Sequence, residues 1–135
     1  MHIQAIIETV MYVDDLAKTE TFYRTILGLP VFAKELGRHV FFQVGATSVL
    51  LAFIADVTLK GDQLPPHGTK GPGHFALGIQ ADALNAWRDH LRGNGVAIET
   101  EVQWPLGGKS LYFRDPAGNS VELVTSGVGG LPSGW

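Results

Sequence analysis

The sequence contains no cysteine, no long apolar run and no cluster of basic residues. Without cysteine there can be no disulfide, no thiolate nucleophile and no thiolate metal ligand. The longest uninterrupted apolar run, residues 49–55, is far too short to span a bilayer, and residues 1–13 lack the basic start of a secretion signal. A net charge of -3 without a basic run disfavours nucleic acid and anionic membranes as partners. We therefore expect a soluble, cytoplasmic protein with neither partner.

A chain of 135 residues that is 45% hydrophobic is long enough to bury a core. We expect one domain, 1–135, built from two modules at about 3–55 and 73–126. Residues 56–72 would connect the modules, and residues 127–135 would form a tail. The connector is rich in Gly and Pro, and a connector of that length is usually either mobile or functional. His67 and Lys70 lie in it and are expected to be solvated.

Residues 110–124 have the pattern of a β-hairpin. The sequence Asp115-Pro116-Ala117-Gly118 suits a type I turn, because Asp accepts backbone hydrogen bonds, Pro presets φ and Gly adopts the left-handed conformation. A three-residue loop with a bulge at Gly118 separates apolar from polar side chains. The apolar face would carry Leu111, Phe113, Val121 and Leu123. The other face would carry Tyr112, Arg114, Ser120 and Glu122, with Glu122 opposite Tyr112. Glu is depleted in strands, although the second face of a sheet can also simply be wet.

The first half of the chain has a β-α-β-β-β pattern. Residues 3–13 are strand-like, Asp14 or Asp15 is a natural N-cap, and the helical periodicity ends before Gly28. Three short strands are expected to follow, at residues 31–33, 38–44 and 47–55.

The second half repeats this order. Residues 73–79 form a strand, Asp82 would cap a helix that ends at Gly93-Asn94-Gly95, and a strand at 96–102 precedes the hairpin. Two modules this short should pack together, since neither buries its sheet face alone.

Aligning the halves reveals four equivalent positions on the first and last strands. Glu8 aligns with His74 at an offset of 66 residues, whereas Leu51 aligns with Glu122, and Phe41 with Tyr112, at an offset of 71. The change in offset from 66 to 71 residues requires only small insertions in loops. Three of the four positions, Glu8, His74 and Glu122, carry side chains that can bind a metal ion.

If these positions face one concavity, two carboxylates and an imidazole would be costly to bury without a cation. The donor set suits one divalent ion, Mn, Fe, Ni, Co or Zn, without discriminating among them. Three protein ligands leave positions open, as in catalytic sites. The metal would act as a Lewis acid, and Glu8 or Glu122 could act as a base after leaving it. Alternatively, His74 is simply hydrogen-bonded, and Glu8 forms an ion pair with Arg114 or Lys109.

Three segments carry a family likeness: residues 8–31, residues 73–79 with the helix that follows, and residues 110–123. Together they resemble the vicinal oxygen chelate superfamily, which contains glyoxalase I, extradiol dioxygenases, fosfomycin-resistance enzymes and bleomycin-binding proteins. The resemblance implies an α+β fold of two βαβββ modules that form curved half-barrel sheets, and a homodimer with sites between modules. It also implies metal ligands at the positions of Glu8, Leu51, His74 and Glu122.

Two of these positions depart from the family pattern. Glyoxalase I-like members typically carry Glu at the position of Leu51, which cannot bind a metal. Extradiol dioxygenases and fosfomycin enzymes usually carry His at the position of Glu8. The additional negative charge should make a ferrous ion easier to oxidise, which puts dioxygenase chemistry in doubt.

The same strand alternation predicts an aromatic-rich wall for a small organic substrate. Its members would be Val10, Tyr12, His39, Phe41, Gln43, Phe53, Ala76, Tyr112 and Arg114. Core packing is the alternative for Tyr12, Phe41 and Phe53. Arg114 is either an exposed cation beside the turn or a clamp for a carboxylate or phosphate. His39 is either an acid/base group or, as we expect, a surface residue on an edge strand.

The leading hypothesis is a small metal-dependent enzyme of the glyoxalase/dioxygenase type, a lyase, isomerase or oxygenase. Its catalytic groups would be Glu8, Glu122 and Tyr112, acting on an oxygen-chelating, partly aromatic substrate. The alternative is a metal-free binding protein of the bleomycin-resistance type that sequesters an aromatic compound between subunits. A third hypothesis is an inactive paralogue with a structural role.

Overall fold

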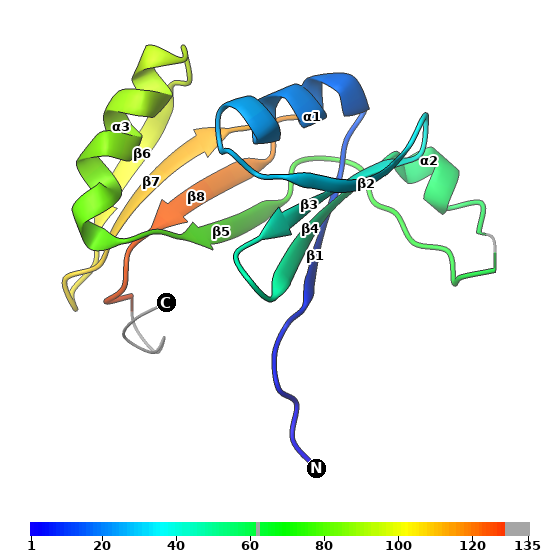
Figure 1. Ribbon diagram of the computed structural model, residues 1–135, viewed down its shortest axis with the longest axis horizontal. Helices are drawn as coiled ribbons and strands as arrows, with labels where there is room; N and C mark the ends of the chain where they lie inside the picture. Colours follow the sequence, from blue (N-terminus) through cyan, green and yellow to red (C-terminus); the bar gives the residue numbers. More distant parts are fainter. Residues whose placement is uncertain (62, 129–135) are drawn as a thin grey trace. The chain divides into compact units, whose positions relative to one another are not determined.

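The structure is a computed structural model that describes residues 1–61 and 63–128 (Figure 1). The chain divides into two compact units, unit 1 (Met1–Gly73) and unit 2 (His74–Trp135). Each unit contains a four-stranded sheet whose first strand runs parallel to its last, while the remaining neighbours are antiparallel. Two βαβββ modules of the α+β class are therefore present, as the sequence predicts.

Unit 1 forms a sheet in the order β1-β4-β3-β2. Its elements are β1 (Glu8–Tyr12), α1 (Leu16–Thr25), β2 (Val31–Glu35), β3 (His39–Val44), β4 (Ser48–Phe53) and α2 (Ala55–Thr58). Asp15 caps α1 by accepting a hydrogen bond from the Lys18 backbone N–H at 2.9 Å. The helix packs against β3 and β4 and buries Tyr23 completely.

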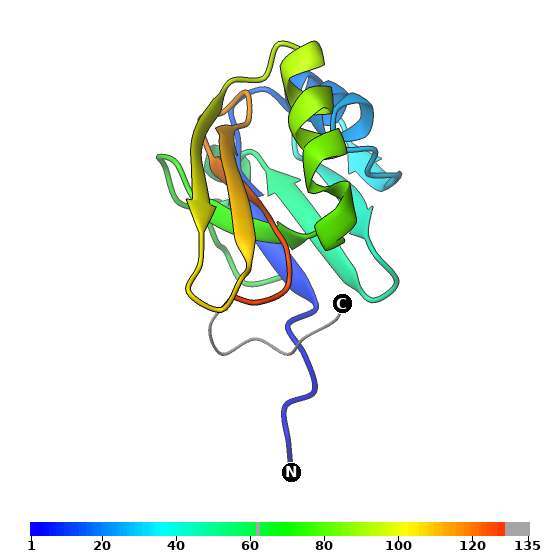
Figure 2. The ribbon, with the colours of Figure 1, turned by 90° about the vertical axis from the view of Figure 1, so that its left-hand side faces the viewer.

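Unit 2 forms a sheet in the order β5-β8-β7-β6. Its elements are β5 (His74–Gly78), a 3₁₀ turn η1 (Ala81–Ala83), α3 (Leu84–Gly93), β6 (Ile98–Gln103), β7 (Lys109–Arg114) and β8 (Ser120–Val124). Figure 2 shows α3 running along this sheet, and the helix contributes Leu84 and Leu91 to the core.

The two sheets have the same strand register. Phe41 pairs with Leu51 in unit 1, and Tyr112 pairs with Glu122 in unit 2. Both second strands also carry an irregularity at the equivalent place, between Val31 and Ala33 and between Ile98 and Thr100. The duplication inferred from the sequence is thus confirmed in the backbone pairing.

The hairpin of unit 2 has the register that the turn chemistry predicts. Arg114 pairs with Ser120, and the four residues of the predicted apolar face are at most 1% exposed. The buried Asp115 side chain accepts backbone hydrogen bonds from Ala117 and Asn119. Gly118 has a φ of 86°, the left-handed conformation that favours glycine.

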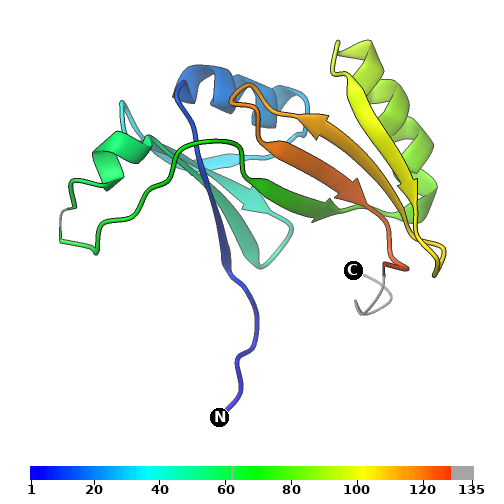
Figure 3. The same ribbon diagram turned by 180° about the vertical axis from the view of Figure 1, so that it is seen from behind.

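Three expectations about local structure are wrong, and one short helix was not predicted. Strand β1 begins at Glu8 and not at residue 3, and Asp82 lies within the 3₁₀ turn and does not cap α3, whose N-cap is Ala83. The helix that was not predicted is α2, at the start of the connector; Figure 3 shows α2 and the segment after it following β4. His39 is not on an edge strand, since β3 lies between β4 and β2. Of the predicted tail, residues 129–135 lie outside the described residues.

No helix in the described ranges is both long and apolar enough to cross a lipid bilayer.

Candidate functional site

A buried carboxylate lies at the centre of the sheet of unit 2. Glu122 on β8 is flanked by Tyr112 on β7 and Ala76 on β5, and the residue is only 6% exposed. Its Oε1 accepts a hydrogen bond from the Ser110 hydroxyl at 2.5 Å, and the Ser110 oxygen accepts one from the Trp104 indole N–H at 2.8 Å. These donors hold one carboxylate oxygen in place and offset part of the cost of burying the group.

His74 faces the other oxygen of that carboxylate. The Nδ1 atom of His74 lies 3.1 Å from the Ser120 carbonyl oxygen, which can only accept, so Nδ1 carries the hydrogen of the bond. The lone pair of the neutral ring is then on Nε2, which lies 3.5 Å from Oε2 of Glu122. An imidazole whose outer nitrogen is fixed by a backbone carbonyl is the usual arrangement for a histidine that binds a metal.

The separation of these two atoms fits a shared metal ion. Ligand atoms about 2.1 Å from one ion are roughly 3 to 3.5 Å apart, depending on the coordination geometry. The Nε2 and Oε2 atoms lie at the upper end of that range. The donor set of imidazole nitrogen and carboxylate oxygen, with no sulfur, suits a borderline or hard divalent ion.

Tyr112 borders this pair. Its ring stacks on that of His74 with centroids 6.0 Å apart, and it faces Glu122 across the strand pair. Burial, together with the hydrogen bond and negative charge of Glu122, raises the pKa of the Tyr112 phenol above its ordinary value. Tyr112 therefore remains a phenol near neutral pH and serves as a hydrogen-bond donor.

The third predicted ligand belongs to the other unit. Glu8 is exposed on β1 and pairs with Val49, the counterpart of the pairing of His74 with Ser120. Over residues 1–61 and 63–128, no group of three or more His, Asp or Glu side chains has the spacing of a metal site. His74 and Glu122 are brought together, while the participation of Glu8 stays a prediction.

Arg114 has partners within unit 2. Its Nε donates to Oε1 of Glu99 at 3.0 Å, and its Nη1 donates to the Gly118 carbonyl at 3.1 Å. Both side chains of this ion pair are about half exposed. A ligand carboxylate or phosphate would have to compete with Glu99 for the guanidinium.

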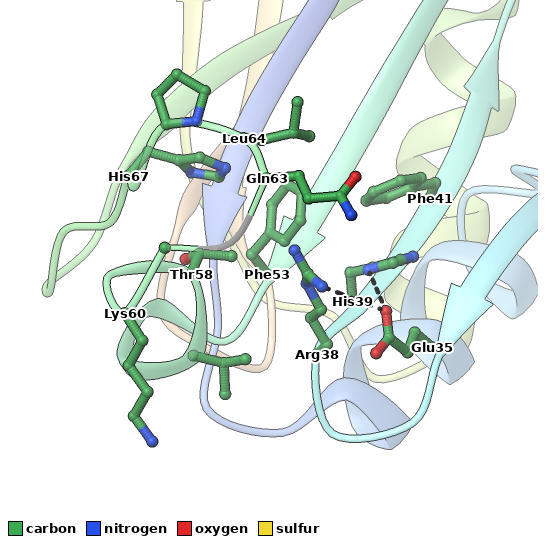
Figure 4. A pocket seen from close by; sticks show the side chains of 13 residues that line it. Glu35, Arg38, His39, Phe41, Phe53, Thr58, Lys60, Gln63, Leu64 and His67 are labelled. Carbon is green, nitrogen blue, oxygen red and sulfur yellow. Dashed lines mark ion pairs between the residues drawn. The ribbon is translucent and has the colours of Figure 1, made fainter.

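Unit 1 contains a cavity of about 530 Å³, lined by strands β2 to β4 and by the connector (Figure 4). Three of the predicted substrate residues, His39, Phe41 and Phe53, form its aromatic side. The remaining lining residues are Glu35, Arg38, Val57, Thr58, Lys60, Gly61, Gln63, Leu64, Pro65 and His67. Sequence reasoning missed the connector residues, although the length of that segment was a signal that it could be functional.

His39 is held neutral in this cavity. Its ring stacks on Phe41 with centroids 4.1 Å apart, and its Nδ1 lies 3.8 Å from Oε2 of Glu35, beyond hydrogen-bonding distance. Burial lowers the pKa of His39 below its ordinary value, while the charge of Glu35 acts in the opposite direction and that of Arg38 adds to the lowering.

His67 is an exposed loop residue, as expected, but it also contacts side chains of β1 and β4. The hydroxyl of Tyr12 is 2.7 Å from Nδ1 of His67, and the His67 ring meets Phe53 edge-on with centroids 4.9 Å apart. Burial raises the pKa of Tyr12, so this phenol stays protonated. The contact joins β1 to the connector across 55 positions of sequence.

The sequence of these two units matches a known protein family. Residues 5–123 match the family model described as the Glyoxalase/Bleomycin resistance protein/Dioxygenase superfamily. The chain belongs to this superfamily.

The chain is also similar to individual proteins. The chain is similar to a crystal structure of lactoylglutathione lyase from Agrobacterium tumefaciens, with 36% identity, a TM-score of 0.90, and coverage of 96% of this chain and 98% of that one. It is 28% identical to metallothiol transferase FosB of Staphylococcus saprophyticus over 124 residues, which are 91% of this chain and 78% of FosB. A superfamily member from Sphaerobacter thermophilus, 21% identical with a TM-score of 0.71 and coverage of 92% and 98%, shares the fold.

Proposed function

We propose that the protein is a divalent-metal-dependent enzyme that acts on a small, oxygen-chelating organic substrate, with Glu8, His74 and Glu122 as its metal ligands. The 3.5 Å approach of His74 Nε2 to Glu122 Oε2 is the observation that carries this proposal. The family relationship supports it, since two relatives bear the names of enzymes, lactoylglutathione lyase and metallothiol transferase.

A bound ion would supply Lewis acidity and polarise an oxygen of the substrate. The protein groups have distinct roles around it. The Ser120 carbonyl fixes the tautomer of His74, and Ser110 holds Oε1 of Glu122. Tyr112 remains protonated and donates a hydrogen bond to substrate oxygen, while Glu8, which is exposed on its strand, would leave the ion to accept a proton when a base is needed.

Metal binding tests the proposal directly. We expect the wild-type protein to bind about one equivalent of Mn, Fe, Ni, Co or Zn in a calorimetric titration after removal of chelators. Glu122→Gln should weaken the affinity at least about tenfold, because it replaces a charged ligand and disturbs the Ser110 contact. Glu20→Gln is a matched control, since Glu20 lies in α1 and pairs with Arg24 and Lys34. Binding that is absent with all five metals, or unchanged in Glu122→Gln, would contradict the proposal.

Activity assays should begin with the hemithioacetal of methylglyoxal and a thiol, followed by catechols. The names of the two relatives, which refer to lactoylglutathione and to a thiol, favour that order. Turnover that depends on added metal would distinguish the enzyme from the alternative function, a metal-free protein that sequesters an aromatic compound.

The superfamily relationship also leads us to propose a homodimer. Light scattering at micromolar concentration should give twice the mass of the chain, and a monomer would contradict this assembly.

A further inference from the structure

The aromatic lining of the unit 1 cavity is a cluster of four rings that contact one another. His39 lies parallel to Phe41, with an angle of 14° between the rings, whereas Phe53 meets Phe41 edge-on at 67°. His67 meets Phe53 edge-on at 81°. Rings prefer parallel-offset and edge-to-face partners, so such a lining selects a planar molecule over a puckered one of the same volume. The volume of about 530 Å³ lies within the range of small-molecule sites.

The connector supplies a directed polar group to this cavity. A phenol hydroxyl is a stronger hydrogen-bond donor than a neutral imidazole N–H, and an imidazole nitrogen is a stronger acceptor than a phenol oxygen, so we assign the Tyr12 hydroxyl as the donor to Nδ1 of His67. The neutral imidazole then carries its hydrogen on Nε2. Figure 4 shows the His67 ring among the side chains that line the cavity. His67 thus offers its Nε2–H to a ligand as a hydrogen-bond donor. The hydrogen bond from Tyr12 to Nδ1 fixes this tautomer.

The connector is held in position by three further contacts. The backbone N–H of His67 donates to the Thr58 carbonyl at 3.3 Å, and Lys70 forms an ion pair with Asp56 at 2.9 Å. A Cβ atom at Gly68 would lie 2.6 Å from Cγ of Leu59 and 3.1 Å from the Ala55 carbonyl oxygen. Residue 68 is therefore packed tightly against α2, and His67 is placed by the fold.

The lining of the cavity includes one acidic residue, Glu35, and two basic residues, Arg38 and Lys60. Arg38 lies 3.7 Å from Glu35, which also faces His39. This pair is neutral overall, and Figure 4 shows the Lys60 side chain pointing away from the other lining side chains, so the ligand is not required to carry a charge. An oxygen that accepts a hydrogen bond is sufficient to pair with His67.

We propose that the cavity of unit 1 binds a planar aromatic ring bearing a hydroxyl or related oxygen, and that His67, oriented by Tyr12, selects for this oxygen. This inference adds a substrate class to the proposed function. That the bound ring is a substrate rests on the proposed function. The binding itself needs no metal, so the two can fail separately.

Phenol and toluene test the selection, because they differ only in a hydroxyl and a methyl group. We expect the full chain in EDTA to bind phenol at least about fivefold more tightly than toluene in ligand-observed NMR titrations, the value of one net hydrogen bond. Cyclohexanol, which keeps the hydroxyl and loses planarity, should bind at least about threefold more weakly than phenol.

Three variants separate the roles of the aromatic lining and of the donor. His67→Ala should reduce the preference for phenol over toluene to less than about twofold. The substitution also removes one ring of the lining and should weaken both ligands, so the ratio of the two affinities is the readout. Tyr12→Phe should reduce the same preference, because it removes the group that fixes the tautomer of His67. Phe41→Leu should weaken phenol and toluene alike, about threefold.

His90→Ala is the matched control, since His90 lies on α3 in unit 2 and contacts Trp87. It should leave both affinities unchanged. Equal binding of phenol and toluene by the wild type, no saturable binding of either, or an unchanged preference in a folded His67→Ala protein would each overturn the inference. Loss of metal binding without loss of phenol binding would instead contradict only the proposed function.

Discussion

The two sheets share one backbone register but carry opposite chemistry at equivalent positions. Where unit 1 has Leu51 opposite Phe41, unit 2 has Glu122 opposite Tyr112. In the next cross-strand pair on the same face, unit 1 has His39 opposite Phe53, and unit 2 has Ser110 opposite Val124. One face is an aromatic box around a cavity, whereas the other is a hydrogen-bonded network around a buried carboxylate.

Because the register is the same although these side chains differ, strand order and register must depend on residues that both units have in common. Both bury a phenylalanine completely on the third strand, Phe42 in unit 1 and Phe113 in unit 2, on the face opposite that of Phe41 and Tyr112. The opposite face is then available for side chains that bind ligand or metal without changing strand order. We propose a division of labour, in which unit 1 recognises a ring and unit 2 supplies most of the metal ligands.

The largest expected effect tests whether the shared frame is equally important in both units. Phe42→Ala and Phe113→Ala should each lower the free energy of unfolding by about 3–5 kcal/mol, because each deletes a fully buried ring and leaves a cavity. Chemical denaturation followed by tryptophan fluorescence and circular dichroism would measure both. If the chain is one domain, both probes should report a single transition in each variant. A loss confined to one probe would show that the units unfold separately.

A second prediction exchanges the chemistry of one position between units. Leu51→Glu places a carboxylate on the aromatic face, with no hydroxyl like that of Ser110 to receive it, and should cost about 2–3 kcal/mol of unfolding free energy. Glu122→Leu removes a buried charge but leaves the Ser110 and Tyr112 hydroxyls without this acceptor, and because these effects oppose each other the free energy should change by less than about 1.5 kcal/mol. Equal costs in denaturant titrations would contradict the asymmetry between the two faces.

The smallest expected effect concerns pH and the neutral His39 of unit 1. The pKa of His39 is below its ordinary value, so the unfolded chain binds this proton more tightly than the folded one. The free energy of unfolding should therefore fall as the pH drops below about 6.5, the ordinary range of histidine, and be unaffected above it. His39→Gln should reduce this slope between pH 5 and 7 in urea titrations. An identical slope in wild type and variant would show that other groups account for it.

The features that sequence reasoning predicted are those with local causes. The register of the unit 2 hairpin follows from Asp115, Gly118 and the alternation of its strands, all within 15 residues, and it is confirmed. The approach of His74 to Glu122 followed from comparing equivalent positions, which is also a regularity of the sequence. The shared register of the two sheets explains why that comparison worked.

The features that it missed depend on contacts between distant segments. Residues 3–7 are rich in isoleucine and look like a strand, yet β1 begins only at Glu8, where β4 becomes available as a partner. Strand propensity has little effect without a neighbouring strand. The contact of His67 with Tyr12 spans 55 positions and leaves no periodic signal, so a connector of ordinary loop composition concealed a residue of the cavity.

The parallel pairing of first and last strands has a consequence for how the chain folds. Glu8 pairs with Val49 and His74 with Ser120, so each sheet is completed by contacts between residues about 40 to 50 positions apart. The antiparallel hairpins that lie between the first and last strands of each unit can form early from local contacts. Joining the first strand to the last requires closing a long loop, and this step should limit the folding rate. During synthesis, unit 1 has its whole sheet once β4 has emerged and all the residues that line its cavity once residue 67 has followed, before the ribosome has released the residues of unit 2.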